Sequence, residues 1–133
     1  MAQVYFNDQL IATNTIHGVL HHALLGEEIV ITYQHKKNKY YTIIMYADDV
    51  HSMIMNVKGD DFDTGDIIVA YTPFQTKNIN YDATIFIYEQ SGKNKLPSND
   101  FDLEHYAEEN KLTLLYVIEF TILQQIKRKT KRK

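Results

Sequence analysis

The chain has 133 residues, a length typical of one domain that buries its own hydrophobic core. Hydrophobic residues make up 44% of it and aromatic residues 12%, which excludes an intrinsically disordered chain. It contains no cysteine, so disulfides, thiolate metal sites and cysteine nucleophiles are excluded. No apolar run approaches the ~20 residues of a membrane-spanning helix, and no secretory signal opens the sequence, so we expect a cytoplasmic protein without membrane contact.

The formal net charge of −3 is unevenly distributed along the chain. Residues 1–126 contain 8 basic and 17 acidic residues, a net charge of −9. We therefore expect a single domain over residues 1–126, followed by a basic tail over residues 127–133 that is a candidate for binding polyanions. The tail holds six of the 14 basic residues, namely Lys127, Arg128, Lys129, Lys131, Arg132 and Lys133.

The predicted elements begin with a hairpin, since the strand-like residues 4–6 and 10–13 flank the turn-forming pair Asn7 and Asp8. A helix that Asn14 or Thr15 caps and Gly26 ends is predicted next. Its apolar residues recur at helical spacing, at Ile16, Val19, Leu20, Ala23 and Leu24.

The middle of the chain is predicted to hold two strands and a short helix. Residues 27–33 and 40–47 are strand-like and are separated by the polar loop 34–39. Residues 48–56 are predicted to form a short helix that begins at Asp48 or Asp49.

The rest of the chain continues the alternation of strands and helices. Residues 66–72 and 83–89 are predicted buried strands, 102–110 a helix, 113–117 a short strand, and 118–129 a final helix running into the tail. This order predicts an α/β fold, a single compact domain with a mixed sheet and three to four packed helices. The predicted core comprises Ile29, Ile31, Ile43, Met45, Ile85, Ile87, Leu103, Tyr106 and Leu114.

Two thirds of the chain show an order and spacing of residues found in one known family. In the last third, an apolar strand closes on a glutamate, and a polar loop leads to a helix of the form Asp-Leu-x-x-aromatic-Ala. These positions are Glu89, Asp102, Leu103, Tyr106, Ala107 and Leu112. In the first third, Gly-Glu precedes a β-branched strand, and a second strand ends near Met-x-Ala-acid. These positions are Gly26, Glu27, Ile29, Val30, Ile31, Ile43, Ile44, Met45, Ala47 and Asp48.

This pattern resembles the 3,4-dihydroxy-2-butanone-4-phosphate synthase family of riboflavin biosynthesis. The resemblance implies a trimmed synthase scaffold and a homodimer. Family enzymes use acidic residues after the first strand to bind Mg²⁺ and to move protons on ribulose 5-phosphate. Here residues 33–41 contain no carboxylate and residues 66–83 contain no histidine, so only Glu89 matches a catalytic position. Lysines in the loop would repel a dication, and we therefore expect neither a metal nor another cofactor.

The loop over residues 34–39 is the main candidate for a binding site. It carries three lysines between tyrosines, and cations beside aromatic rings suit a phosphate or a nucleotide. A solvated turn between two strands is the alternative, which the surface position of charged turns favours. The predicted anion-binding residues are Lys36, Lys37, Lys39 and Tyr40.

Two other groups suggest metal sites, but their spacing is incomplete. His17 and His21 stand four residues apart, as in a zinc pair, yet no third ligand follows, which favours surface histidines. A cluster of aspartates resembles a calcium loop, but the EF-hand spacing fails and an acidic turn is favoured. These aspartates are Asp60, Asp61, Asp63 and Asp66.

The sequence favours a non-catalytic binding or regulatory protein that acts through contacts with other proteins. One alternative is an enzyme, either a phosphosugar lyase of riboflavin biosynthesis or a derived activity around Glu89, which the missing acids disfavour. Alone, Glu89 is more typical of a paired residue at a strand end. The other alternative is a nucleic-acid-associated protein that uses the basic tail, which the charge of −9 on residues 1–126 opposes.

Overall fold

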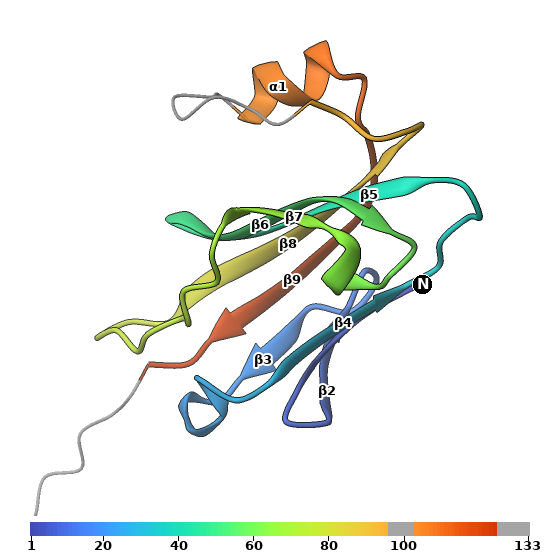
Figure 1. Ribbon diagram of the computed structural model, residues 1–133. Helices are drawn as coiled ribbons and strands as arrows, with labels where there is room; N and C mark the ends of the chain where they lie inside the picture. Colours follow the sequence, from blue (N-terminus) through green and yellow to red (C-terminus); the bar gives the residue numbers. More distant parts are fainter. Residues whose placement is uncertain (96–102, 125–133) are drawn as a thin grey trace, which may run out of the picture.

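The computed structural model describes residues 1–95 and 103–124, without the side chains of residues 103–105. The basic tail and the side chain of the predicted core residue Leu103 lie outside what is described. Within these ranges the chain forms nine β-strands, one α-helix and two short 3₁₀ helices (Figure 1). The strands are β1 (Ala2–Phe6), β2 (Gln9–Thr13), β3 (Gly18–Leu20), β4 (Ile29–Tyr33), β5 (Tyr40–Ala47), β6 (Asp49–Lys58), β7 (Asp66–Val69), β8 (Tyr81–Gln90) and β9 (Thr113–Ile122); the helices are η1 (His22–Leu24), η2 (Phe62–Thr64) and α1 (Leu103–Glu109).

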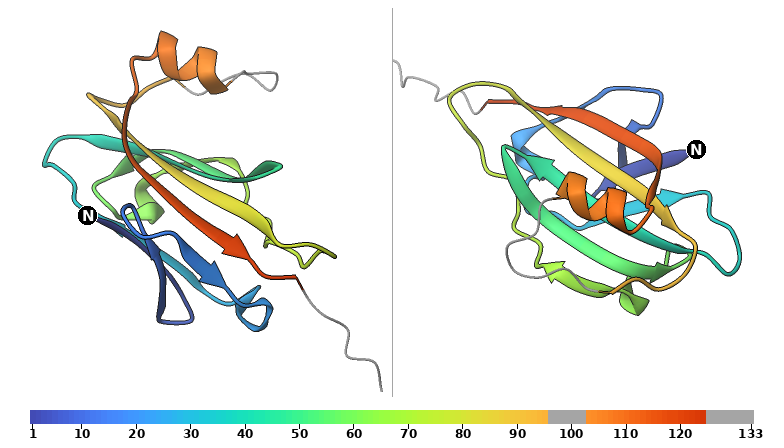
Figure 2. Two further views of the ribbon diagram at one scale, coloured as in Figure 1. Left: turned by 180° about the vertical axis from the view of Figure 1, so that it is seen from behind. Right: turned by 90° about the horizontal axis from the view of Figure 1, so that it is seen from above.

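The strands form two sheets that pack face to face. The smaller sheet has the order β2-β1-β4 and the larger one β3-β9-β8-β5-β6-β7. All pairs are antiparallel except β3 with β9, which is parallel. Figures 1 and 2 show the small sheet against one face of the large sheet, and α1 beside one end of the opposite face. The architecture is therefore a β-sandwich with one helix on its outside.

The main core lies between the two sheets. Alternate residues of the large sheet point toward the small sheet, because successive side chains of a strand face opposite ways. These residues include Ile43, Met45, Ile85, Ile87, Ile118, Phe120 and Ile122, which pack against Val4, Phe6 and Ile31 of the small sheet. A second, smaller cluster lies on the outer face, where Tyr106 of α1 covers Ile44, Met53 and Met55.

The predicted α/β fold with three to four helices is wrong, because three predicted helices fall on segments that are mostly extended. The first, after Asn14, contains only strand β3 and the three-residue η1. Ile16 and Val19 are exposed, while Leu20 is fully buried. Gly18 also opposes a helix: a Cβ at this position would lie 1.8 Å from the carbonyl oxygen of Ile11, so the backbones meet too closely for a side chain.

The other two wrong helices belong to long strands of the large sheet. Residues 49–58 form β6, and Asp48, at φ 62°, makes the turn from β5. The segment from Ile118 onward continues β9 as far as Ile122 rather than beginning a helix. The predicted hairpin around Asn7 and Asp8 is confirmed. The predicted helix 102–110 corresponds to α1, and the predicted strands 27–33, 40–47 and 83–89 correspond to β4, β5 and β8.

Most of the predicted core is confirmed. Six of its members are buried, namely Ile31, Ile43, Met45, Ile85, Ile87 and Tyr106. Ile29 is only half-buried, and Leu114, near the start of β9, is 47% exposed. No helix in the described part of the chain is long and apolar enough to cross a membrane.

Truncating Ile87 should reveal the sandwich core. Ile87 is fully buried between the sheets, so Ile87→Ala should lower the free energy of unfolding by about 2–5 kcal/mol through lost burial and a new cavity. Leu114→Ala is the matched control and should change it by less than about 0.5 kcal/mol. Urea titrations of both variants measure the difference. Equal effects would contradict the placement of β8 and β9.

Candidate functional site

Three neighbouring strands of the large sheet, β8, β5 and β6, have termini at the same end of the sheet. β5 begins there, while β6 and β8 end there, because both strands run antiparallel to β5. Tyr40 therefore pairs with Lys58 on one side and with Gln90 on the other. The loop of residues 34–39 connects β4 of the small sheet to the start of β5 at this end. The register thus places Lys58 beside the lysines of the loop.

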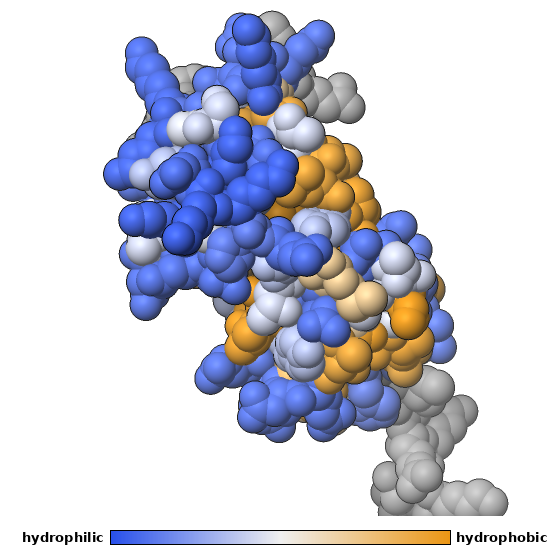
Figure 3. Space-filling model, turned by 90° about the vertical axis from the view of Figure 1, so that its right-hand side faces the viewer, coloured by the Kyte–Doolittle hydropathy of each residue, from blue (hydrophilic) through white to orange (hydrophobic). Residues whose placement is uncertain are grey.

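These segments surround a surface depression of about 510 Å³, which we name the basic hollow. Figure 3 shows the side of the molecule toward which the β4–β5 loop extends, and hydrophilic residues dominate the upper part of this face. Of the eight basic residues in 1–126, four lie around the hollow. The hollow is lined by His35, Lys36, Lys37, Asn38, Lys39, Lys58, Gly59, Asp61 and Thr64.

Tyr41 anchors the loop from below. Its ring is fully buried, and its hydroxyl accepts a hydrogen bond from the backbone N–H of Lys36 at 2.7 Å and donates one to Glu89 Oε2 at 3.3 Å. The Lys36 Nζ lies 3.9 Å from Glu89 Oε1, with the Lys36 side chain 72% exposed and that of Glu89 14% exposed. Glu89 is therefore a paired residue beneath the loop. This agrees with the prediction that a single glutamate here is a paired residue at a strand end.

Tyr33 fixes the opposite wall of the hollow. Its hydroxyl donates a hydrogen bond to the carbonyl of Gly59 at 2.6 Å and so ties the end of β4 to the turn after β6. Gly59 has φ +62°, and a Cβ there would lie 3.1 Å from the ring of His35. A glycine meets both constraints, because it adopts positive φ without strain and leaves room for the imidazole.

Both tyrosines stay neutral at physiological pH. Burial raises the pKa of the Tyr33 phenol far above its ordinary value, and the negative charge of Asp60 adds to this effect. Burial also raises the pKa of Tyr41, and the nearby Glu89 carboxylate acts in the same direction. Each hydroxyl therefore serves as a hydrogen-bond donor that holds the loop, and neither is poised to act as a base.

A buried hydrogen-bond network fixes the strand ends under the hollow. Gln90 donates from Nε2 to Asn56 Oδ1 at 2.8 Å, and its Oε1 accepts from Thr42 Oγ1 at 2.6 Å and from the backbone N–H of Asn56 at 3.1 Å. Asn56 also donates to Asp66 Oδ2 at 2.9 Å. All three residues of the central network are buried. Glu89 and Lys58 stand one and two residues from it along their strands.

The structure brings three of the four predicted anion-binding residues together. Lys36, Lys37 and Lys39 line the hollow, whereas Tyr40 is half-buried outside it, with the Lys93 Nζ 5.9 Å from its ring centroid. Sequence reasoning missed Lys58 and His35. Lys58 comes from a segment near the predicted helix 48–56, and only the pairing of β5 with β6 brings it to the loop.

The metal patterns do not form metal sites. His17 and His21 lie outside any α-helix: His17 Nε2 is 2.8 Å from Thr121 Oγ1, and His21 Nδ1 accepts from the backbone of Ala23. The aspartate cluster is an acidic turn in which Asp61 caps η2. Among the described residues, no group of three or more His, Asp or Glu side chains could hold a metal ion.

Replacing Tyr33 should reduce the loss of free energy of unfolding that occurs as the pH rises above about 9. Above the ordinary phenol pKa of 10.0, the unfolded chain loses this proton while the folded protein keeps it. The stabilising contribution is therefore complete below about pH 10 and is lost as the pH rises further. Between about pH 9 and 11, Tyr33→Phe should lose about 1 kcal/mol less free energy of unfolding than the parent protein. Urea titrations across this range test it, and parallel profiles would contradict a buried, neutral Tyr33.

Two solved structures are similar to this chain in fold. The first is carboxypeptidase Y inhibitor complexed with its cognate proteinase, with a TM-score of 0.72, 12% identity, and coverage of 93% of this chain and 83% of that one. The second is a phosphatidylethanolamine-binding protein from Plasmodium falciparum, with a TM-score of 0.65, 12% identity, and coverage of 91% and 83%. No family model and no curated protein matches the chain.

These likenesses overturn the expected synthase scaffold. The chain is not a trimmed 3,4-dihydroxy-2-butanone-4-phosphate synthase, and neither the α/β architecture nor a riboflavin-biosynthesis scaffold is supported. The homodimer was expected from that resemblance alone, so it loses its basis. The chain has a β-rich fold, similar to the fold that carboxypeptidase Y inhibitor shares with the phosphatidylethanolamine-binding protein.

Proposed function

We propose that this protein is a non-catalytic binding protein whose basic hollow docks on an acidic surface of another protein. The observation that carries the proposal is the gathering of four lysines around one depression on a body that is otherwise acidic. Residues 1–126 have a net charge of −9, yet half of their basic residues lie around this hollow. Such a charge contrast attracts an acidic partner and orients it toward one side of the molecule.

The exposure of the lysines favours a protein over a small anion. The Lys36 side chain is 72% exposed and Lys37 is exposed as well, so their ammonium groups remain hydrated. Small anions are held in pockets by convergent donors that are fixed in place. A broad basic rim instead complements the broad acidic surface of a folded partner. The fold itself is compatible with this role, since carboxypeptidase Y inhibitor was solved in complex with a proteinase.

The surroundings of Glu89 support a structural rather than a catalytic role. Its carboxylate accepts a hydrogen bond from Tyr41 and lies near Lys36. Tyr41 is itself held by the backbone of Lys36. The carboxylate therefore helps to fix the loop that displays the lysines, so the same group that could have been a catalytic acid supports the binding surface.

Reversing the loop charges should abolish docking. In Lys36→Glu/Lys37→Glu/Lys39→Glu the hollow would repel an acidic partner, and the affinity should fall by roughly tenfold to a hundredfold. The matched control Lys77→Glu/Lys95→Glu/Lys111→Glu changes the net charge equally at exposed positions that do not line the hollow. Immobilised parent and variant proteins would capture partners from a lysate of the cells that make the protein. The affinity of a purified partner would then be measured at two salt concentrations.

The expected result is a partner that binds the parent protein and the control, loses affinity for the loop variant, and binds more weakly as salt rises. Binding that is equal for all three proteins would contradict the proposal. A further variant without residues 127–133 separates the basic tail from the hollow. If deletion of the tail alone abolished binding, or if the captured material were nucleic acid, the tail would be the binding element instead.

A further inference from the structure

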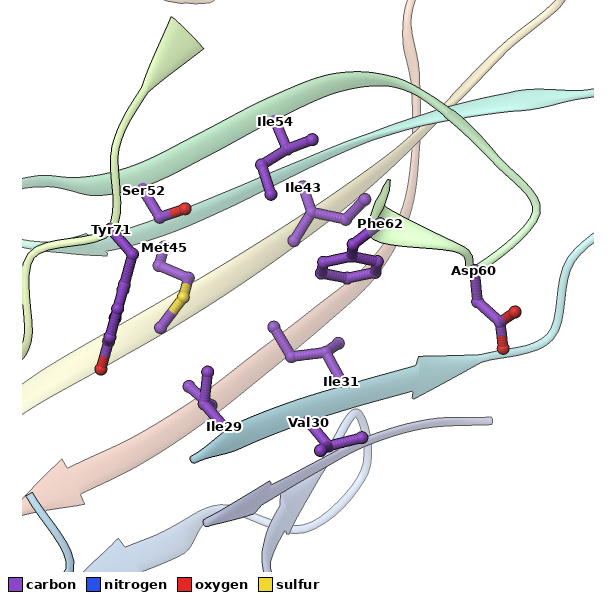
Figure 4. A pocket seen from close by; sticks show the side chains of 10 residues that line it. All are labelled: Ile29, Val30, Ile31, Ile43, Met45, Ser52, Ile54, Asp60, Phe62 and Tyr71. Carbon is purple, nitrogen blue, oxygen red and sulfur yellow. The ribbon is translucent and has the colours of Figure 1, made fainter. Parts of the chain in front are cut away.

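The small sheet covers only part of the large sheet, and this leaves an apolar groove between them. The groove lies between β4, which is the edge of the three-stranded sheet, and β5 and β6 of the six-stranded sheet. Figure 4 shows side chains from both sheets, from Phe62 of η2 and from Tyr71 pointing into this space. Its volume is about 310 Å³, and apart from Ser52 and Asp60 its lining is apolar or aromatic.

The apolar surface continues beyond the groove onto the edge strand β7. Ile67 pairs with Ile54, and side chains of paired residues lie on the same face of a sheet. Ile54 lines the groove, so Ile67 extends the same inner face. The Ile67 side chain is 69% exposed. A fourth strand in the small sheet would cover this part of the large sheet, but the described residues provide none.

The free edge of β4 carries the hydrogen-bonding groups that such a strand needs. Asn7 donates its N–H to the carbonyl of Glu28 at 2.9 Å, so Asn7 and Glu28 form a hydrogen-bonded pair of the antiparallel β1–β4 ladder. Hydrogen-bonded and non-hydrogen-bonded pairs alternate along such a ladder. By this alternation Val30 and Thr32 bond to β1, whereas the N–H and C=O groups of Ile29 and Ile31 point away from it. Among the described residues, no backbone group outside β4 bonds to Ile29 or Ile31 on this side.

Carboxylates stand at both ends of this edge. Glu28 is exposed immediately before β4, and Asp60 lines the groove near the other end, where it also raises the pKa of Tyr33. An occupant with cations near its ends would complement these charges. The groove therefore combines an apolar floor, an unpaired strand edge and acidic ends.

We propose that this groove binds an extended peptide segment of another protein, which adds to β4 as a fourth strand of the small sheet. Its backbone bonds to Ile29 and Ile31, and every second side chain is apolar and enters the groove against Ile54, Phe62 and Ile67. Basic residues flank the apolar stretch and lie near Glu28 and Asp60. No residue lines both this groove and the basic hollow, although the turn after β6 contributes to each, so each proposal has its own test.

The probe is an eight-residue synthetic peptide, blocked at both termini, that alternates valine and threonine between a lysine at each end. Binding to the full-length protein should slow the hydrogen exchange of the Ile29 and Ile31 amides, which have no partner in the free protein. A peptide methylated at alternate backbone nitrogens keeps its side chains but loses the donors that would face β4. Its affinity should fall at least roughly tenfold, because each lost hydrogen bond weakens binding.

Two variants separate groove binding from non-specific contact. Ile67→Ser removes exposed apolar surface beside the groove, on the same sheet face as Ile54, and should weaken the binding of the peptide by roughly fivefold to tenfold. Ile79→Ser, at a residue that is 66% exposed in the loop before β8 and is not paired with a groove residue, should leave the affinity unchanged. A peptide with glutamates in place of the terminal lysines should also bind more weakly.

Three outcomes would overturn the proposal. These are no binding of the lysine-ended peptide, equal affinity of the methylated peptide, and exchange protection that misses Ile29 and Ile31. Pairing of two β4 edges from two copies is the competing occupant, and sedimentation of the free protein detects it. A dimer that Ile67→Ser dissociates would assign the groove to a second copy instead.

Discussion

The hydrogen bonds of Gln90 fix the end of the large sheet on which the binding surface depends. Gln90 joins β8 to Thr42 of β5 and to Asn56 of β6, so it fixes three neighbouring strands at the same level. These groups are buried, and a buried amide without partners costs about 1–3 kcal/mol, so the network has one favourable arrangement. Asn56, which adopts a positive φ of 58°, is part of this arrangement and directs the chain toward Lys58.

The position of each charged group at the hollow follows from this arrangement. With β5, β6 and β8 held in register, Glu89 lies beside Tyr41, and the Tyr41 hydroxyl captures the backbone of Lys36. Tyr33 ties the other side of the loop to Gly59. The loop lysines are thus held close together despite their mutual repulsion, because buried phenols and one carboxylate fix the backbone beneath them. A loop without these anchors would let the lysines separate.

The sequence predicted strands well where apolar alternation was clear and failed where local patterns favoured helices. Apolar and polar residues alternate over residues 118–122, and this two-residue period indicates the strand found in the structure rather than the predicted helix. Residues 48–56 contain two methionines and only two β-branched residues, Val50 and Ile54, and their pairing with β5 and β7 decides their conformation. The synthase resemblance failed for a related reason: it matched the order of strands and a helix along the chain, which unrelated sheets share.

The candidate site was predictable only in part. The loop lysines are adjacent in sequence and could be found directly, whereas Lys58 joins them only through strand pairing. The groove beside β4 carries no sequence signal, since it results from a three-stranded sheet covering a six-stranded one. The most direct test of the central claim is a nuclear magnetic resonance titration of the isotope-labelled protein with its purified partner. We expect the amides of residues 35–39 and those of Lys58 and Gly59 to shift first, before those of Ile29 and Ile31 in the groove. Shifts confined to other parts of the chain would contradict it.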